Sequence, residues 1–125
     1  MQSYPFEFAG QQYELCRIDR NVKDYVCDRL SAQRMNSLTR QMQEKLIDEK
    51  TYAIAKGSTF VRWNSAEFAN DIMVPENMML LIRRLLKDGD KIDDETLNAM
   101  AESESFLAAF ELCREDSEPK KAKGA

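Results

Sequence analysis

The feature that most constrains the fold is a long stretch without helix breakers, because no glycine or proline occurs between residues 11 and 56. The apolar residues of this stretch recur at helical spacing: Val22, Tyr25, Val26, Leu30, Leu38, Met42, Leu46 and Ile47. Proline and glycine are the residues that most disfavour a helix interior. We therefore predict one long or gently broken helix, with two helices between residues 21 and 56 as the alternative. Asn21, a favourable N-cap residue, is its expected start.

The segment before this stretch has the alternation of a β-strand with one buried face. Tyr4, Phe6 and Phe8 alternate with other residues, and the same alternation returns at Tyr13 and Leu15. A glycine lies between the two runs and tolerates the positive φ of a tight turn. We predict a β-hairpin over about residues 4–17. An isolated hairpin is marginal in water, so its aromatic face should pack on helices.

The second half of the chain carries shorter helical patterns. We expect Gly57 to end the preceding helix, residues 58–63 to be extended, and Asn64 with Glu67 to form a capping box for a helix through residue 72. A helix opened by Pro75 carries the apolar run 78–82 and should be the buried centre of the fold. Two last helices should follow: one capped by Asp93 or Asp94, and one capped by Ser103 or Ser105 with a stripe at Phe106, Leu107, Phe110 and Cys113.

Together these patterns predict a mainly α fold, in which an N-terminal β-hairpin packs on a bundle of about four to six helices. The 125 residues suit one domain, which we place at residues 1–114. Residues 115–125 are charged and lack bulky apolar side chains, so we expect a flexible, disordered tail there. The three cysteines should be reduced and should serve mainly as small core residues.

The composition argues against catalysis and metal binding. Histidine is absent, which removes the commonest general base and zinc ligand. The four glycines are dispersed and form no phosphate loop, and the acidic run at residues 88–95 lacks the glycine and glutamate positions of an EF-hand. We therefore predict no enzymatic activity, no metal and no cofactor. The longest apolar run has five residues and no signal peptide is visible, so we expect a cytoplasmic protein without a membrane partner.

Charge and methionine content point to protein partners. Residues 17–62 hold ten basic and six acidic residues, whereas residues 88–118 hold two basic and eleven acidic ones. Such asymmetry favours contact between the oppositely charged halves of the chain or with partners of opposite charge, including self-association, and the acidic balance makes nucleic acid a poor partner. Methionine suits surfaces that accept varied apolar partners. The candidate partner-binding residues are Met35, Met42, Met78, Met79, Arg83 and Arg84.

The chain also resembles the small tail assembly chaperones of long-tailed bacteriophages. The resemblance lies in the hairpin start FEFAGQQYELCR at residues 6–17, the following RIDRNV at 17–22, and the basic end PKKAKGA at 119–125. It implies a helical protein that binds the long tape measure protein in the host cytoplasm while the tail tube polymerises. The family has no catalytic residues to carry over.

Two other functions compete with this one. A structural subunit of a virion or another complex would use the hairpin to extend a neighbour's sheet. A small DNA-binding regulator would need a helix-turn-helix around residues 31–46, and the missing turn glycine and the acidic C-terminal half count against it.

Overall fold

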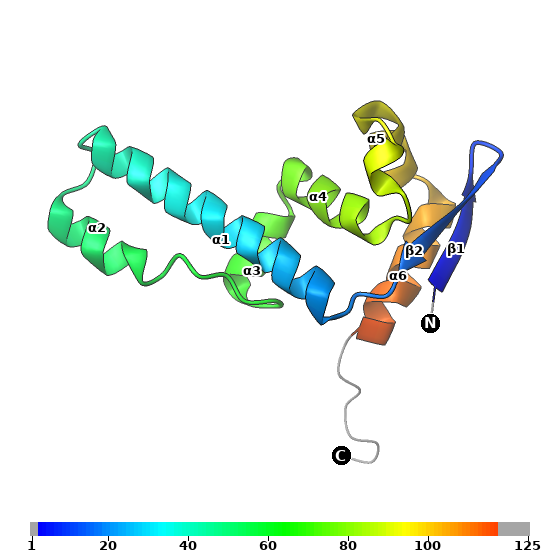
Figure 1. Cartoon of the computed structure of the whole chain (residues 1–125), viewed down its shortest axis with the longest axis horizontal. Coiled ribbons are helices and arrows are strands. Elements are labelled where there is room, and N and C mark those ends of the chain that lie inside the picture. Colours follow the sequence, from blue (N-terminus) through cyan, green and yellow to red (C-terminus); the bar gives the residue numbers. More distant parts are fainter. Residues whose placement is uncertain (1–2, 118–125) are drawn as a thin grey trace, which may run out of the picture. The chain divides into compact units, whose positions relative to one another are not determined.

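The computed structural model describes residues 3–117 and is mainly helical, with an N-terminal antiparallel hairpin (Figure 1). In chain order the elements are β1 (Ser3–Phe8), β2 (Gln11–Cys16), α1 (Arg20–Gln43), α2 (Glu49–Lys56), α3 (Ala66–Ile72), α4 (Pro75–Leu85), the short 3₁₀ helix η1 (Gly89–Lys91), α5 (Asp94–Ala101) and α6 (Glu104–Ser117). The predicted fold class is confirmed. The tail predicted over residues 115–125 is wrong at its start, because α6 continues to Ser117; its remainder lies outside the described residues.

The chain divides into two compact units, which are described separately. Residues up to 22 together with those from 78 onward form the first, here called the hairpin unit. Residues 23–77 form the second, here called the long-helix unit. The divisions fall within α1 and within α4. The single domain predicted over residues 1–114 stays a prediction.

In the hairpin unit, β1 and β2 pair with Phe6 opposite Tyr13. Ala9 and Gly10 connect the strands, and both have positive φ values, 52° and 76°, as a two-residue turn of this hand requires. Phe6 also meets Phe106 of α6 edge to face, with ring centroids 5.5 Å apart. The aromatic face of the hairpin therefore packs on a helix, which confirms the prediction.

The core of the hairpin unit comes from both strands and from four helices, α1, α4, α5 and α6. Its buried apolar side chains are Tyr4, Phe6, Leu15, Ile18, Val22, Leu81, Ile82, Leu85, Leu86, Leu97, Met100, Phe106, Ala109 and Cys113. Leu81 and Leu85 are buried as expected, but residues 78–80 are only half-buried. The helix opened by Pro75 is thus buried along one side rather than all round. Leu107 is exposed, so the predicted stripe on α6 is wrong at that position, and Ala109 occupies the buried side instead.

Helix α1 begins two residues earlier than predicted. The side chain of Asp19 accepts a hydrogen bond from the backbone N–H of Val22 at 2.9 Å, so Asp19, and not Asn21, is the capping residue. The helix then continues without interruption to Gln43. A helix-turn-helix within residues 31–46 is therefore not formed.

The break between α1 and α2 comes from capping rather than from glycine or proline. Lys45 adopts φ 61°, and the N–H groups of Lys45 and Leu46 donate to the carbonyls of Met42 and Gln41 at 3.1 and 2.9 Å. This is a Schellman motif with lysine in the position that glycine usually occupies. Asp48 then caps α2 by accepting from Thr51 N–H at 2.7 Å. Residues 21–56 therefore form two helices, and the single-helix prediction is wrong.

The remaining helix ends are largely those expected. Gly57 ends α2, and Asp93 and Ser103 cap α5 and α6. The capping box at Asn64 is wrong, because Asn64 has φ 62° and the next residue, Ser65, caps α3. Residues 58–63 form no strand.

A buried tyrosine ties the hairpin to α6 and makes the fold sensitive to high pH. The Tyr4 hydroxyl donates to Asp116 Oδ2 at 2.6 Å, and burial together with this hydrogen bond raises the pKa of Tyr4 from 10.0 to about 12. Between about pH 10 and pH 12 the unfolded chain releases a proton that the folded chain keeps, so stability should fall as pH rises through this window. Urea unfolding of the wild type and Tyr4→Phe should show a shallower loss in the variant. Equal losses would contradict a role for Tyr4.

Candidate protein-binding surface

The predicted partner-binding methionines are divided between the two units of the chain. Met35 and Met42 lie on α1 in the long-helix unit, whereas Met78 and Met79 lie on α4 in the hairpin unit. All four are half-buried. Each therefore offers only part of its side chain to a partner.

The two predicted arginines differ in their surroundings. Arg84 is exposed, whereas the guanidinium of Arg83 is held by the segment that follows α4. Arg83 Nη1 donates to the carbonyls of Gly89 and Ile92 at 2.7 and 2.6 Å, and Nη2 pairs with Asp94 Oδ1 at 2.5 Å. Arg83 thus connects α4 to the N-terminus of α5 and stabilises the hairpin unit. Arg83 is thus paired with the acidic segment that follows residue 88.

Gly89 permits this arrangement because it has no side chain. A Cβ atom at this position would lie 2.2 Å from the backbone oxygen of Arg83, and backbone atoms yield little. We therefore expect Gly89→Ala to displace the 89–92 turn and to destabilise the protein by about 1–3 kcal/mol. Urea unfolding measures the change, and Gly57→Ala, which meets only ordinary contact distances, is the matched control. Equal stability of the two variants would contradict the clash.

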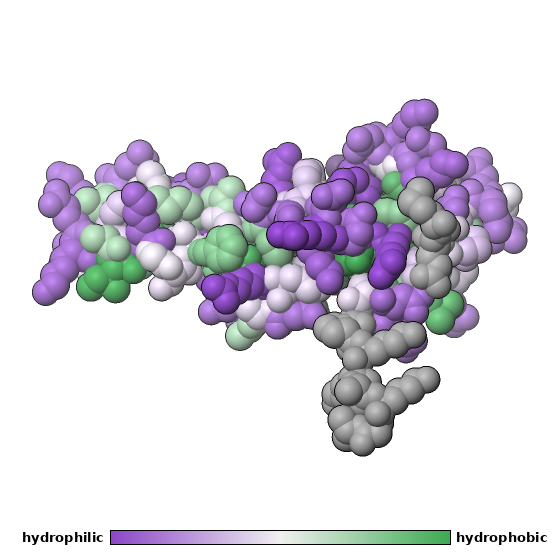
Figure 2. Space-filling view, turned by 60° about the horizontal axis from the view of Figure 1, so that its bottom comes forward, coloured by the Kyte–Doolittle hydropathy of each residue, from purple (hydrophilic) through white to green (hydrophobic). Residues whose placement is uncertain are grey.

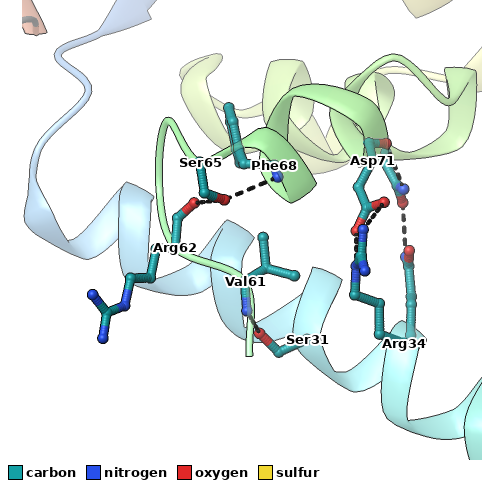
Figure 3. A network of polar contacts seen from close by, with 9 residues as sticks. Ser31, Arg34, Val61, Arg62, Ser65, Phe68 and Asp71 are labelled. Carbon is teal, nitrogen blue, oxygen red and sulfur yellow. Dashed lines mark hydrogen bonds and ion pairs between the residues drawn. The ribbon is translucent and has the colours of Figure 1, made fainter. Parts of the chain in front are cut away.

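A polar network joins the middle of α1 to α3 in the long-helix unit (Figure 3). Arg34 binds Asp71 through two hydrogen bonds, Nε to Oδ2 at 2.6 Å and Nη2 to Oδ1 at 2.9 Å. Hydrogen bonding to Asp71 raises the pKa of Arg34. Ser31 Oγ accepts from the backbone N–H of Val61 at 2.8 Å. These contacts hold α3 and the segment before it against α1.

A buried amide completes the network. Asn77 accepts from Gln33 Nε2 at 2.7 Å and donates its own Nδ2–H to the carbonyl of Asp71 at 2.9 Å. Both its amide oxygen and its nitrogen are therefore paired, as a buried polar side chain requires. This part of the long-helix unit is well fixed.

The segment that connects α1 to this network is built differently. Helix α2 contains no buried residue. Leu46, Ile54 and Phe60 are 70%, 69% and 64% exposed, and we call these three side chains the distal apolar surface. Figure 2 shows green, hydrophobic side chains among polar ones at the left of the view, where α2 lies. Large apolar side chains at this exposure gain little stability from the fold, so they are candidates for contact with a partner.

A small pocket lies between α1 and the end of α2 in the same unit. It encloses about 270 Å³ between the last turns of α1 and the end of α2. Its lining residues are Arg34, Ser37, Leu38, Gln41, Ala55, Ser58 and Thr59. A pocket of this size accommodates one or two apolar side chains of a partner, with Leu38 and Ala55 as apolar walls and serine, threonine and glutamine as polar partners.

The segment that carries these side chains has a small excess of positive charge. Residues 40–62 contain five exposed basic residues and three exposed acidic ones. The basic residues are Arg40, Lys45, Lys50, Lys56 and Arg62; the acidic ones are Glu44, Asp48 and Glu49. An apolar surface bordered in this way favours a partner that is apolar at its centre and acidic at its rim.

Sequence reasoning missed the distal apolar surface. It assigned Leu46 to the buried stripe of one long helix, and it gave no role to Ile54 or Phe60. A sequence signal for this surface does exist. Asp48 followed three residues later by Thr51 is typical of a helix N-terminus, and a new helix that starts at this point means that the long helix has already ended. An eight-residue helix of mostly polar and small residues then has no apolar side with which to bury its isoleucine.

Comparison with known proteins adds no assignment: no family model, curated protein or solved structure matches this chain. Within residues 3–117 no group of three or more potential ligand side chains is placed to hold a metal ion. Over the same residues, none of the helices is long and apolar enough to span a membrane.

A second, larger hollow of about 840 Å³ lies between the hairpin and residues 87–96 and is lined mainly by polar side chains.

Proposed function

We propose that this chain is a non-enzymatic protein-binding protein, and that it acts as an assembly chaperone for the tape measure protein of a long-tailed bacteriophage in the host cytoplasm. The observation that carries the proposal is the distal apolar surface, with three large side chains each more than 60% exposed on a segment whose helix has no buried residue. The resemblance of residues 6–22 to that chaperone family supplies the identity of the client.

The physical character of the surface suits a long helical client. A tape measure protein presents many unequal apolar sites along its length, and a chaperone has to bind them and later release them. Few, exposed anchors with a basic border give weak, reversible contacts, because only the central apolar contacts contribute much affinity. Half-buried Met35 and Met42 on α1 add adaptable apolar area in the same unit.

The test is co-expression of this chain with the tape measure protein from the same genome, followed by affinity purification at low and high salt. We expect the client to be soluble and to co-purify, with less recovered at high salt because exposed charge pairs are screened. Ile54→Asp should reduce the recovered client about tenfold or more by placing a charge at an apolar anchor. Ala69→Asp, at an exposed position of α3 in the same unit, is the matched control. Recovery of this chain alone at both salt concentrations would reject the chaperone proposal.

A structural subunit is the second candidate, and the hairpin edges bear on it. The edge of β2 that does not pair with β1 already has a partner over part of its length. Leu15 pairs with Leu86, and the N–H of Lys87 donates to the carbonyl of Glu14 at 3.1 Å. The other edge strand, β1, contains Pro5, which has no N–H to donate. A neighbour's strand would therefore have to add along β1 with one hydrogen bond missing, so we rank this candidate below the chaperone.

A further inference from the structure

The hollow beside the hairpin has no part in the proposed function. It has a volume of about 840 Å³, and all the residues that line it belong to the hairpin unit. One side is formed by residues 11–14 of β2 with two residues of β1, and the other side by the segment 87–96. A hollow of this volume is large enough for a short peptide segment.

The edge of β2 that borders the hollow carries main-chain groups that point away from β1. In an antiparallel pair, the N–H and C=O groups of successive residues point alternately toward the neighbouring strand and away from it. The carbonyl of Glu14 accepts from the N–H of Lys87 at 3.1 Å, so the main chain of Glu14 points away from β1. Gln12 lies two residues earlier in the same strand, so its N–H and C=O point to the same side. Within residues 3–117, no residue outside the hairpin forms a hydrogen bond with Gln12.

The chain itself pairs with the other end of this edge. Leu86 forms an antiparallel β-bridge with Leu15, and the bond from Lys87 to Glu14 follows. The chain then turns away at Asp88, which has φ 58°, and continues as η1. A complete strand therefore has no room along β2. A short extended segment can continue the same pairing toward the turn of the hairpin, at Gln12.

The side chains around the hollow indicate what such a segment should carry. Tyr13 and Ile92 line the hollow and are half-buried, so they offer some apolar area. The charged side chains of the lining are of both signs, which favours a segment without a large net charge. These charged residues are Glu14, Lys87, Asp88, Lys91 and Asp93.

We propose that this hollow binds a short extended peptide segment of a partner protein, which pairs antiparallel with β2 at Gln12 and places an apolar side chain against Tyr13 and Ile92. Main-chain hydrogen bonds supply affinity in this mode of recognition, and the alternate side chains supply specificity. The segment is extended, whereas the client proposed for the distal apolar surface is helical. The two sites lie in different units, so either proposal can fail while the other holds.

The test begins with selection of short random peptides from a displayed library against the full chain. The strongest binder is then titrated into isotope-labelled protein and followed by NMR. We expect the backbone amide of Gln12 to shift and to exchange more slowly with solvent when the peptide is bound. Thr96→Trp places a large ring in the hollow and should weaken binding about tenfold or more. Asn98→Trp, exposed on the same helix and outside the lining, is the matched control and should bind as the wild type.

Methylation of single main-chain nitrogens in the selected peptide gives the decisive result. A segment that pairs as a β-strand directs only every second N–H at β2, so methylation at alternate positions should abolish binding and methylation between them should be tolerated. Sensitivity without this alternation would overturn the proposal. So would a library that yields no binder, or binders that leave the Gln12 amide unchanged. A shift of this amide with protein concentration alone would assign the hollow to a second copy of the chain and would also overturn it.

Discussion

Phe106→Ala is expected to lower the free energy of unfolding by about 3–5 kcal/mol, the usual cost of removing a buried aromatic side chain. Phe106 is nearly inaccessible to solvent, meets Phe6 edge to face, and stacks on Phe110 with ring centroids 5.7 Å apart. Its removal takes away the aromatic contact between the hairpin and α6. Because small domains are stable by only about 5–15 kcal/mol, the loss is a large fraction of the total.

The measurement is urea unfolding followed by circular dichroism. The matched control is Leu107→Ala, one residue away on the same helix but half exposed, which should cost well under half as much. Similar losses for the two variants would mean that α6 does not pack on the hairpin through Phe106.

Leu81→Ala should lower the free energy of unfolding by about 2–5 kcal/mol. Leu81 is buried in α4 with Leu85 and Ile82 on the same side, so its removal leaves a cavity that rigid neighbours fill only in part. Leu46→Ala makes the same chemical change at a 70% exposed position and should leave stability within about 0.5 kcal/mol of the wild type. An unchanged denaturation midpoint in Leu81→Ala would show that α4 is peripheral.

Several elements could be predicted from the sequence because a strong local signal identified them. The hairpin has alternating aromatic residues on both sides of Gly10, and α4 has Pro75 at its first position and a dense apolar side. The cap at Asp93 was equally recognisable, since its carboxylate accepts from Thr96 N–H. In each case propensity and tertiary packing favour the same structure.

The errors in the predicted elements concern where helices begin and end. Lys45 adopts the left-handed conformation expected of glycine at a helix end, so the end of α1 carried no glycine signal. Asn21 and Asn64 are good capping residues by type, but Asp19 and Ser65 accept the hydrogen bonds. A choice between neighbouring caps depends on where the chain enters the helix, which packing decides.

The candidate site was less predictable than the fold. Exposure of an apolar residue depends on what the rest of the chain brings against it, so for Ile54 the sequence offered only an indirect signal, the cap at Asp48 that starts a short helix. The arginine pair was an accessible signal, but Arg83 stabilises the turn at residues 89–92. Methionine content predicted adaptable surface, and the structure leaves the four chosen methionines half-buried.

The central claim is that the distal apolar surface contacts a helical protein client, and site-specific photo-crosslinking tests it most directly. A photoreactive phenylalanine analogue replaces Phe60, an exposed member of that surface, and in a second sample replaces Ala69, which is exposed on α3. Each full-length protein is irradiated after co-expression with the tape measure protein. We predict a covalent adduct with the client from position 60 and little or none from position 69. Equal adduct from both positions, or none from position 60 while the client still co-purifies, would contradict the account.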